Sequence, residues 1–390
     1  MAASLAEDVG GLPAVAWLAA AVRLAIVAAL WGTCRMRATT LPAIAATAVG
    51  VTGSSGAWDV RPQLVGLLFF VIVAAAAWRS VDDGRPRWWL IPLTWVWAMS
   101  HGTWVLGVVT LLVTAMASLV DRRSDPLRQH VARFAVPVGM AAIAALTPVG
   151  PRLYTTLTSI SEVSAFIQEW QPVSLREAPM AVTFVGVGVV VVSWIRGWVQ
   201  RPSWGRISLL AFAAVNALMY GRTIAVAAIL TAPLLAEVLQ AVVPRRGENL
   251  ARVEALALSV GVLSSLTFAA IHLPTVARLP GDAPNAMSSV LESLPSQVVF
   301  NEEGAGGWLH WKHPQLTPVI DTRWEVYGRD SVLEYGRVLQ VAAGWEAGLD
   351  RTGTRLALLK ADSPLAVALQ AQRQWDVLSS DSGFVLLSPR

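Results

Sequence analysis

Residues 88–120 have the sequence WWLIPLTWVWAMSHGTWVLGVVTLLVTAMASLV. This stretch contains no lysine, arginine, aspartate or glutamate. One membrane-crossing helix needs about 20 apolar residues, so the stretch is too long for a single crossing. The polar break Ser100-His101-Gly102 divides it near its middle. We therefore expect a helical hairpin, with one helix over 88–99 and the other over 103–120.

Comparable apolar stretches lie on both sides of this hairpin. The chain has 390 residues, of which 55% are hydrophobic and only 14% are charged, whereas soluble proteins average about 25% charged residues. The sequence predicts a polytopic α-helical membrane protein with about ten transmembrane helices in residues 1–272. The expected spans are 14–33, 38–55, 63–78, 88–99, 103–120, 131–149, 179–195, 206–220, 223–243 and 253–272.

Arginines between these stretches predict the orientation. They fall in five loops that lie on one face if every stretch crosses, and arginine-rich short loops are typically cytoplasmic. We therefore expect a plasma-membrane protein whose polar interruptions, together with everything after residue 272, lie on the opposite, extracytoplasmic face. Any site should lie there. The arginines are 35 and 37; 79, 85 and 87; 122, 123 and 128; 196, 201 and 206; and 245, 246 and 252.

The start of the chain fits this orientation poorly. Ten crossings with the C-terminus outside also put the N-terminus outside, yet nothing near Met1 would direct it across, and an additional upstream helix would remove the difficulty. The dispersed arginines do not indicate nucleic-acid binding. The single cysteine, Cys34, excludes an internal disulfide and is expected to be a small buried residue.

Residues 273–390 have the composition of a soluble domain. Strands are expected at 296–301, 317–321, 355–360, 375–378 and 383–387, the last two as a hairpin across 379–382. Helices are expected at 331–343 and at 364–373, where Ser363 and Pro364 suit the N-cap and first positions. This alternation predicts a small extracytoplasmic α/β domain. Gly304-Ala305-Gly306-Gly307 fits no phosphate-binding pattern and is interpreted as a tight turn.

Several polar residues on the outer face are candidates for binding. Arg61 and Arg222 could recognise a phosphate inside a cavity, or simply anchor to lipid phosphate. His101 lies at membrane depth, where an ionisable residue usually faces a cavity or a partner, although it could instead serve the helix break. Trp170 beside Glu169 resembles a sugar-binding pair. Asp321 ends a predicted strand, where α/β sheets place ligands.

A set of motifs occurs here in a familiar order. It comprises Arg61-Pro62-Gln63, Trp97-Ala98-Met99-Ser100-His101-Gly102, Thr147-Pro148-Val149-Gly150, Glu169-Trp170-Gln171-Pro172, Arg222, Gly306-Gly307-Trp308-Leu309, Val319-Ile320-Asp321-Thr322-Arg323 and Trp375. In this order the set resembles a bacterial family of multipass GT-C-type glycosyltransferase-like proteins, most of them uncharacterised. The resemblance covers roughly residues 10–390.

The resemblance implies an enzyme that uses a polyprenyl-phosphate sugar at the extracytoplasmic face. GT-C enzymes carry an acidic catalytic residue in the loop after their first helix, and this chain has no such loop. It begins where the family's second helix would begin. Glu169 and Asp59 are the weak candidates for a base, and pairing with Arg61 would make Asp59 a poor one.

Two other functions stay open. One is a non-catalytic scaffold or accessory protein whose C-terminal domain binds a protein partner. The other is a transporter or flippase, which would favour inverted repeats and charges near the bilayer midplane. We find no convincing repeat, and Arg23 is the only charge well inside a span. No cofactor is evident, and nothing in the sequence supports a divalent metal.

Overall fold

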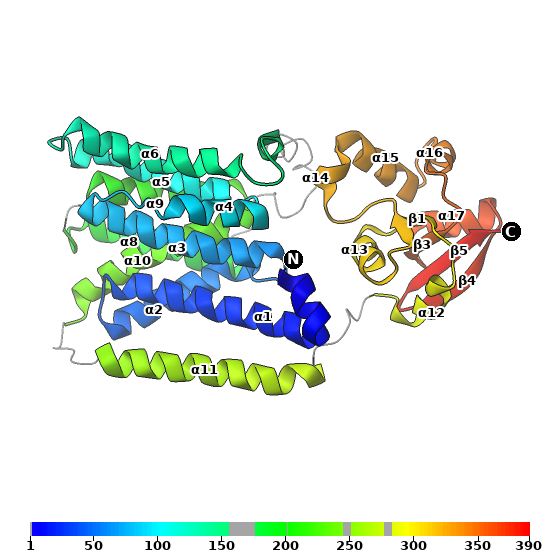
Figure 1. Ribbon diagram of the computed structural model, residues 1–390, viewed down its shortest axis with the longest axis horizontal. Coiled ribbons are helices and arrows are strands. Elements are labelled where there is room, and N and C mark those ends of the chain that lie inside the picture. The colour runs from blue at the N-terminus through cyan, green and yellow to red at the C-terminus, as the bar shows by residue number, and fades with distance from the viewer. Residues whose placement is uncertain (1, 156–175, 201, 245–250, 277–282) are drawn as a thin grey trace. The chain divides into compact units, whose positions relative to one another are not determined.

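The computed structural model describes residues 2–155, 176–200, 202–244, 251–276 and 283–390. The chain divides into a helical unit that ends at Val276 and a C-terminal unit that includes Ala277–Arg390. Each of the ten apolar stretches overlaps a helix of the helical unit (Figure 1). These helices are α1 (Ala2–Arg35), α2 (Thr40–Ser54), α3 (Pro62–Asp83), α4 (Leu90–Ser100), α5 (Trp104–Asp121), α6 (Leu127–Ala144), α8 (Ala178–Ile195), α9 (Trp204–Met219), α10 (Ile224–Val242) and α11 (Ala251–Val276).

Six helices of the described chain are long and apolar enough to cross a membrane. The apolar helices α4 and α9 are shorter. The chain is thus mostly helical and carries several helices that suit a bilayer. The six segments are Leu5–Arg35, Pro62–Asp83, Trp104–Asp121, Ala178–Ile195, Ile224–Val242 and Val253–Thr275.

The break in residues 88–120 forms as the sequence predicts. α4 ends because His101 adopts an extended backbone, with φ at −163°, and α5 begins at Trp104. The Trp97 ring then packs onto α5 at Gly107, where a Cβ would stand 2.5 Å from the ring. Gly107 therefore lets the two helices approach each other.

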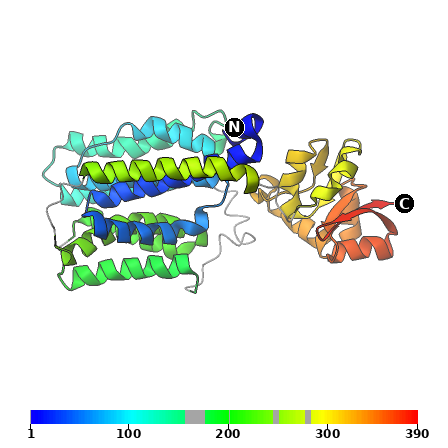
Figure 2. The ribbon, with the colours of Figure 1, turned by 90° about the horizontal axis from the view of Figure 1, so that it is seen from below.

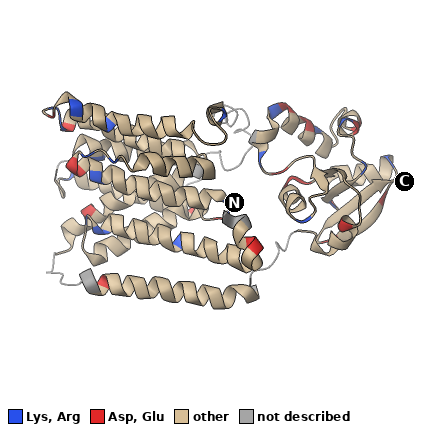
Figure 3. Ribbon diagram, in the orientation of Figure 1, with Lys and Arg blue, Asp and Glu red and all other residues tan. Residues whose placement is uncertain are grey.

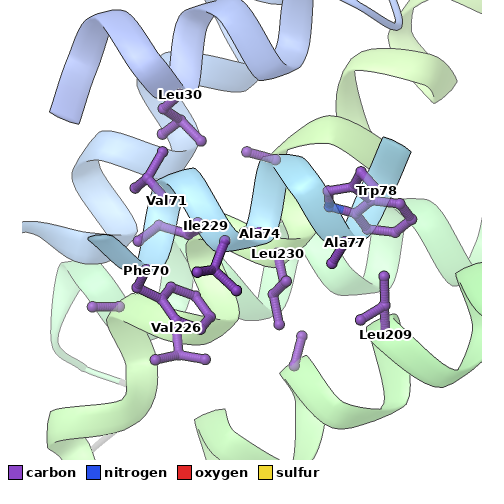
Figure 4. Packing of buried hydrophobic residues seen from close by; sticks show 14 of the residues in the cluster. Leu30, Phe70, Val71, Ala74, Ala77, Trp78, Leu209, Val226, Ile229 and Leu230 are labelled. Carbon is purple, nitrogen blue, oxygen red and sulfur yellow. The ribbon is translucent and has the colours of Figure 1, made fainter. Parts of the chain in front are cut away.

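The core of the helical unit forms around α10. In the most apolar segment of this helix, 83% of the residues are buried. The helix packs against α1, α2, α8 and α9. Figure 4 shows α3 meeting this core through one face. Phe70, Ala74 and Trp78 on that face recur every four residues, the spacing that keeps side chains on one side of a helix. Leu30, Leu209, Val226, Ile229 and Leu230 supply the opposing surface.

Ion pairs bring the arginine-rich loops together at one end of the helical unit. Arg37 lies 2.7 Å from Asp82 and 3.9 Å from Glu237. Arg206 lies 3.3 Å from Glu237 and 3.9 Å from Asp82. Four segments far apart in the sequence therefore share one charge network. We call this end of the unit the basic end, and Figure 3 shows charged residues gathered there.

Two further contacts tie other segments to the basic end. The Asp121 carboxylate accepts hydrogen bonds from the Trp204 and Gly205 backbone N–H groups at 2.8 and 2.7 Å, so it caps α9. Arg35 pairs with Glu254 of α11 at 2.8 Å. Helix α11 lies on the outside of the unit along α1 (Figure 2).

The C-terminal unit contains a five-stranded sheet in the order β2-β1-β3-β5-β4. The first three strands are parallel, and β5 is antiparallel to both β3 and β4. The predicted small α/β region is therefore present, with β2 shorter than expected. The strands are β1 (Gln297–Asn301), β2 (Leu316–Pro318), β3 (Ala357–Lys360), β4 (Trp375–Asp381) and β5 (Phe384–Pro389).

Helices cover both faces of this sheet because successive strand residues point to opposite sides. Val299 packs with α12 (Ser288–Glu292) and α13 (Glu303–Lys312). The next residue, Phe300, packs on the other face with α15 (Arg329–Leu339), α16 (Trp345–Arg351) and α17 (Pro364–Gln372). As predicted, Ser363 caps α17, its hydroxyl accepting from the Ala366 N–H. A short helix, α14 (Trp324–Tyr327), follows β2.

Two local predictions were wrong. The closing hairpin turns at Ser382–Gly383 and not across 379–382, because both residues have positive φ, as a two-residue hairpin turn requires. The segment Gly304–Gly307 is part of α13 and not a tight turn. Of its three glycines, only Gly306 lies in close contact with another segment, at Ile320 and Asp321.

Candidate functional site

Arg61 begins α3 at the end of the helical unit opposite the basic end. Arg61 has an extended backbone and is followed by Pro62, whose fixed φ suits the first position of a helix. From Arg61 to Asp83 the helix rises about 33 Å. The Arg61 backbone N–H donates to the Asp59 carbonyl oxygen at 2.8 Å. Both side chains are exposed, and the described structure shows no ion pair that joins the Asp59 carboxylate to the Arg61 guanidinium.

Arg23 is a second cation at this end, which the sequence motifs did not single out. Its Nε and one terminal nitrogen donate to the Trp58 carbonyl oxygen at 3.1 and 2.7 Å. Trp58 precedes Arg61 by only three residues. The signal was present in the sequence, since an arginine inside an apolar stretch usually contacts a partner or a cavity.

His101 lies against the first turns of α3. A Cβ on Gly66 would stand 3.2 Å from the His101 Cβ, and Gly66 lies five residues after Arg61, about 7.5 Å along the helix. The His101 Nδ1 accepts from the Thr103 backbone N–H at 3.2 Å. Its proton therefore sits on Nε2, which acts as a hydrogen-bond donor. The same contact closes the helix break, so the structural role considered for His101 is also present.

The remaining candidates of this end are only partly described. Arg222 lies in a 3-10 turn, Gly221–Thr223, between α9 and α10, and its side chain is outside the described structure. Gly53 packs on Ala228 in the second turn of α10, which places the segment before Arg61 near that turn. Glu169 and Trp170 lie outside the described residues. The structure thus places Arg61, His101 and the Arg222 backbone at the same end.

Asp321 forms a separate polar cluster in the C-terminal unit, beyond the carboxyl end of β2. Its side chain is 3% exposed and accepts from the Arg323 backbone N–H at 2.8 Å and from the Arg323 guanidinium. Burial opposes ionisation of Asp321, but the hydrogen bonds from Arg323 outweigh it and hold the pKa of Asp321 below its usual range.

Gly306 brings His310 to the same cluster. A Cβ on Gly306 would stand 2.8 Å from the Asp321 Cβ and closer still to the Ile320 carbonyl oxygen. Helix α13 can therefore lie directly on the end of β2 only with glycine there. One turn further along, the His310 Nε2 lies 3.6 Å from the Asp321 carboxylate. The glycine-rich segment serves close packing and not phosphate binding.

Two more titratable groups surround Asp321. Burial and the nearby Asp321 and Glu302 carboxylates raise the pKa of Glu303. Burial and the Asp321 charge raise the pKa of Tyr327. Asp321 is already saturated by its donors, so the exposed Arg323 and His310 are the groups that could meet a ligand. An arginine beside a histidine suits an anionic ligand.

In the described part of the chain, no group of three or more histidine, cysteine, aspartate or glutamate side chains could hold a metal ion. Comparison with protein-family models finds no match to this sequence, and comparison with curated proteins finds none either. The function therefore has to be argued from these residues and their surroundings.

Proposed function

We propose that the chain is a membrane protein that binds a polyprenyl-phosphate sugar at the end of the helical unit that carries Arg61, and acts as a GT-C-like glycosyltransferase. The basic end is cytoplasmic in this proposal, following the rule that arginine-rich loops stay inside. The Arg61 end and the C-terminal unit then face outward. The apolar helices described above provide the surroundings that a polyprenyl chain requires.

One observation carries the proposal. Arg23 binds the carbonyl of Trp58, Arg61 follows three residues later, and His101 packs against the helix that Arg61 begins. Two guanidinium groups and an N–H donor are thereby held at one end of an otherwise apolar bundle. Guanidinium groups bind phosphate with paired hydrogen bonds, and a neutral histidine donor can complete the contact.

Binding of a polyprenyl monophosphate to the purified full chain tests this proposal. We expect the phosphate to raise the thermal unfolding midpoint, while the corresponding polyprenol without phosphate should have little effect. Arg61→Gln and His101→Gln should each weaken phosphate binding about tenfold, because a charge-assisted hydrogen bond contributes roughly 1.5–3 kcal/mol. Arg123→Gln, an equal change in an exposed loop at the basic end, is the matched control.

The catalytic part of the proposal requires a separate variant. Asp59 lies two residues before Arg61 and has no ion pair with it, so its carboxylate is available as a base for the acceptor hydroxyl. Asp59→Asn should abolish sugar transfer from a labelled polyprenyl-phosphate sugar and leave phosphate binding unchanged. Equal effects of polyprenol and its phosphate would reject the binding site and favour the non-catalytic scaffold.

A further inference from the structure

A small cavity of about 20 Å³ opens at the basic end, far from the site proposed above. It lies between α3, α5 and α6 and also touches the first turn of α9. Leu111 and Arg122 both line it, although they are eleven residues apart, about 16 Å along the helix direction. The lining is apolar at depth, with Leu111, Ala115 and Val136, and becomes cationic towards the loops.

Four arginines form the cationic part: Arg85, Arg87, Arg122 and Arg133. Two of them are neutralised, because Arg87 pairs with Asp83 and Arg133 pairs with Asp125. The buried Arg87 Nε nevertheless has no hydrogen-bond partner within the described structure.

The other two arginines, Arg85 and Arg122, form no ion pair with a carboxylate in the described ranges. Arg122 donates only to the carbonyl oxygens of Val81 and Asp82. The exposed Arg85 guanidinium forms no hydrogen bond or ion pair there. Asp121 also lines the cavity, but its two oxygens are occupied by the backbone N–H groups that begin α9. These hydrogen bonds do not cancel the charge of Asp121, so four arginines against the carboxylates of Asp83, Asp121 and Asp125 leave the cavity a net charge of +1.

Gly84 holds these arginines in place. Its left-handed conformation, with φ at +68°, ends α3 and turns the chain towards Arg85. Its carbonyl oxygen accepts from the Arg133 Nε at 2.8 Å. A Cβ at this position would stand 2.7 Å from the Arg122 Nε, so a side chain there would displace the Arg122 guanidinium from its present position. One residue thus positions groups from both neighbouring helices.

We propose that this cavity binds the phosphate group of an anionic phospholipid. The guanidinium groups of Arg85 and Arg122 would contact the phosphate at the opening of the cavity, and the acyl chains would stay in the bilayer, because Leu111 and Val136 are already buried by protein. Basic pockets at the cytoplasmic ends of membrane helices suit such headgroups. The inference rests on the proposed membrane insertion but not on glycosyl transfer.

The test uses the purified full chain in nanodiscs of phosphatidylcholine, into which phosphatidylglycerol is titrated. Native mass spectrometry counts the retained phosphatidylglycerol, and the thermal unfolding midpoint reports stabilisation. We expect preferential retention of phosphatidylglycerol by the unmodified chain. Arg85→Gln combined with Arg122→Gln should weaken it about tenfold or more, since each arginine near anionic lipid contributes about 1 kcal/mol.

Matched controls separate this site from general attraction to the basic end. Arg123→Gln combined with Arg128→Gln removes the same charge from exposed residues outside the cavity and should leave the preference intact. Arg85→Gln alone removes no side-chain hydrogen bond or ion pair within the described structure, so it should fold normally and still weaken retention.

Three results would overturn the lipid assignment. They are an equal loss in both double variants, no preference for phosphatidylglycerol, or saturable stabilisation by inorganic phosphate that lipid does not compete with. Arg61→Gln should leave the preference unchanged, which separates this site from the polyprenyl-phosphate site. A chain that does not enter nanodiscs at all would instead refute membrane insertion.

Discussion

Gly306 and Ile320 lie so close that the Ile320 carbonyl oxygen occupies the space that a side chain on Gly306 would need. This contact seats α13 on the end of β2 and brings His310 to Asp321. The spacing of helix and strand in the C-terminal unit therefore depends on one missing methyl group.

Gly306→Ala should destabilise the C-terminal unit by about 1–3 kcal/mol, because backbone and not a flexible side chain must move. Hydrogen exchange of the peptides that cover β1 and β2 should accelerate. Gly307→Ala is the control, since nothing lies within 4 Å of a Cβ there. It should stabilise the same helix by roughly 0.5–1 kcal/mol. Similar effects of the two substitutions would contradict the packing argument.

The charge network at the basic end provides a second prediction. Arg37 is 9% exposed and contacts both Asp82 and Glu237. Arg37→Gln should lower stability by about 1–2 kcal/mol, less than for a fully buried pair because Asp82 is half exposed. The thermal unfolding midpoint of the purified chain measures this. Adding Glu237→Gln to Arg37→Gln should recover part of the loss, and a purely additive double variant would argue against coupling.

His313 predicts a pH dependence of the C-terminal unit. Its side chain is fully buried, and both ring nitrogens lack hydrogen-bond partners in the described structure. Burial lowers the pKa of His313, Lys312 adds to this effect, and Glu292 opposes it. Because the folded form resists protonation, stability is complete above the unfolded pKa of about 6.5 and falls as the pH drops through it.

His313→Phe should remove this acid sensitivity and keep the edge-on contact with the Trp308 ring. Hydrogen exchange of the C-terminal unit, corrected for intrinsic exchange rates and compared between pH 7 and pH 5, measures the difference. A variant that loses protection on acidification as strongly as the unmodified chain would show that other groups cause the effect.

Labelling of introduced cysteines tests the proposed orientation. Cys34 is buried and can be replaced by alanine. Ser380→Cys, exposed in the C-terminal unit, should react with an impermeant maleimide in intact cells. Ser124→Cys, exposed at the basic end, should react only after permeabilisation. The opposite pattern would reverse the orientation and with it the proposed outward-facing site.

The sequence predicted the helices well because long apolar stretches separated by arginines have few alternative structures. The break at Ser100–Gly102 was recognisable for the same reason. The strands were recognisable from β-branched and apolar runs. The position of the hairpin turn depended instead on the backbone conformation of Ser382 and Gly383, which composition hardly constrains.

The relationships within the sites were much less predictable. The pairing of Arg37 with Glu237 joins residues 200 positions apart, and nothing in either local sequence indicates the other. The role of Gly306 depends on a backbone oxygen of a different segment. Arg23 was visible as a charge inside an apolar stretch, but its partner, the Trp58 carbonyl, carries no sequence signal at all.

Helices α10 and α11 are similarly apolar, but they differ in burial. In the most apolar segment of α10, 83% of the residues are buried inside the unit, whereas none are buried in that of α11. Their tolerance of substitution should therefore differ. Exchanging one apolar side chain for another on α10 changes the fit against fixed neighbours, whereas most such exchanges on α11 change side chains that no neighbouring helix encloses. During evolution α11 can drift among apolar residues, while α10 must change together with the helices around it.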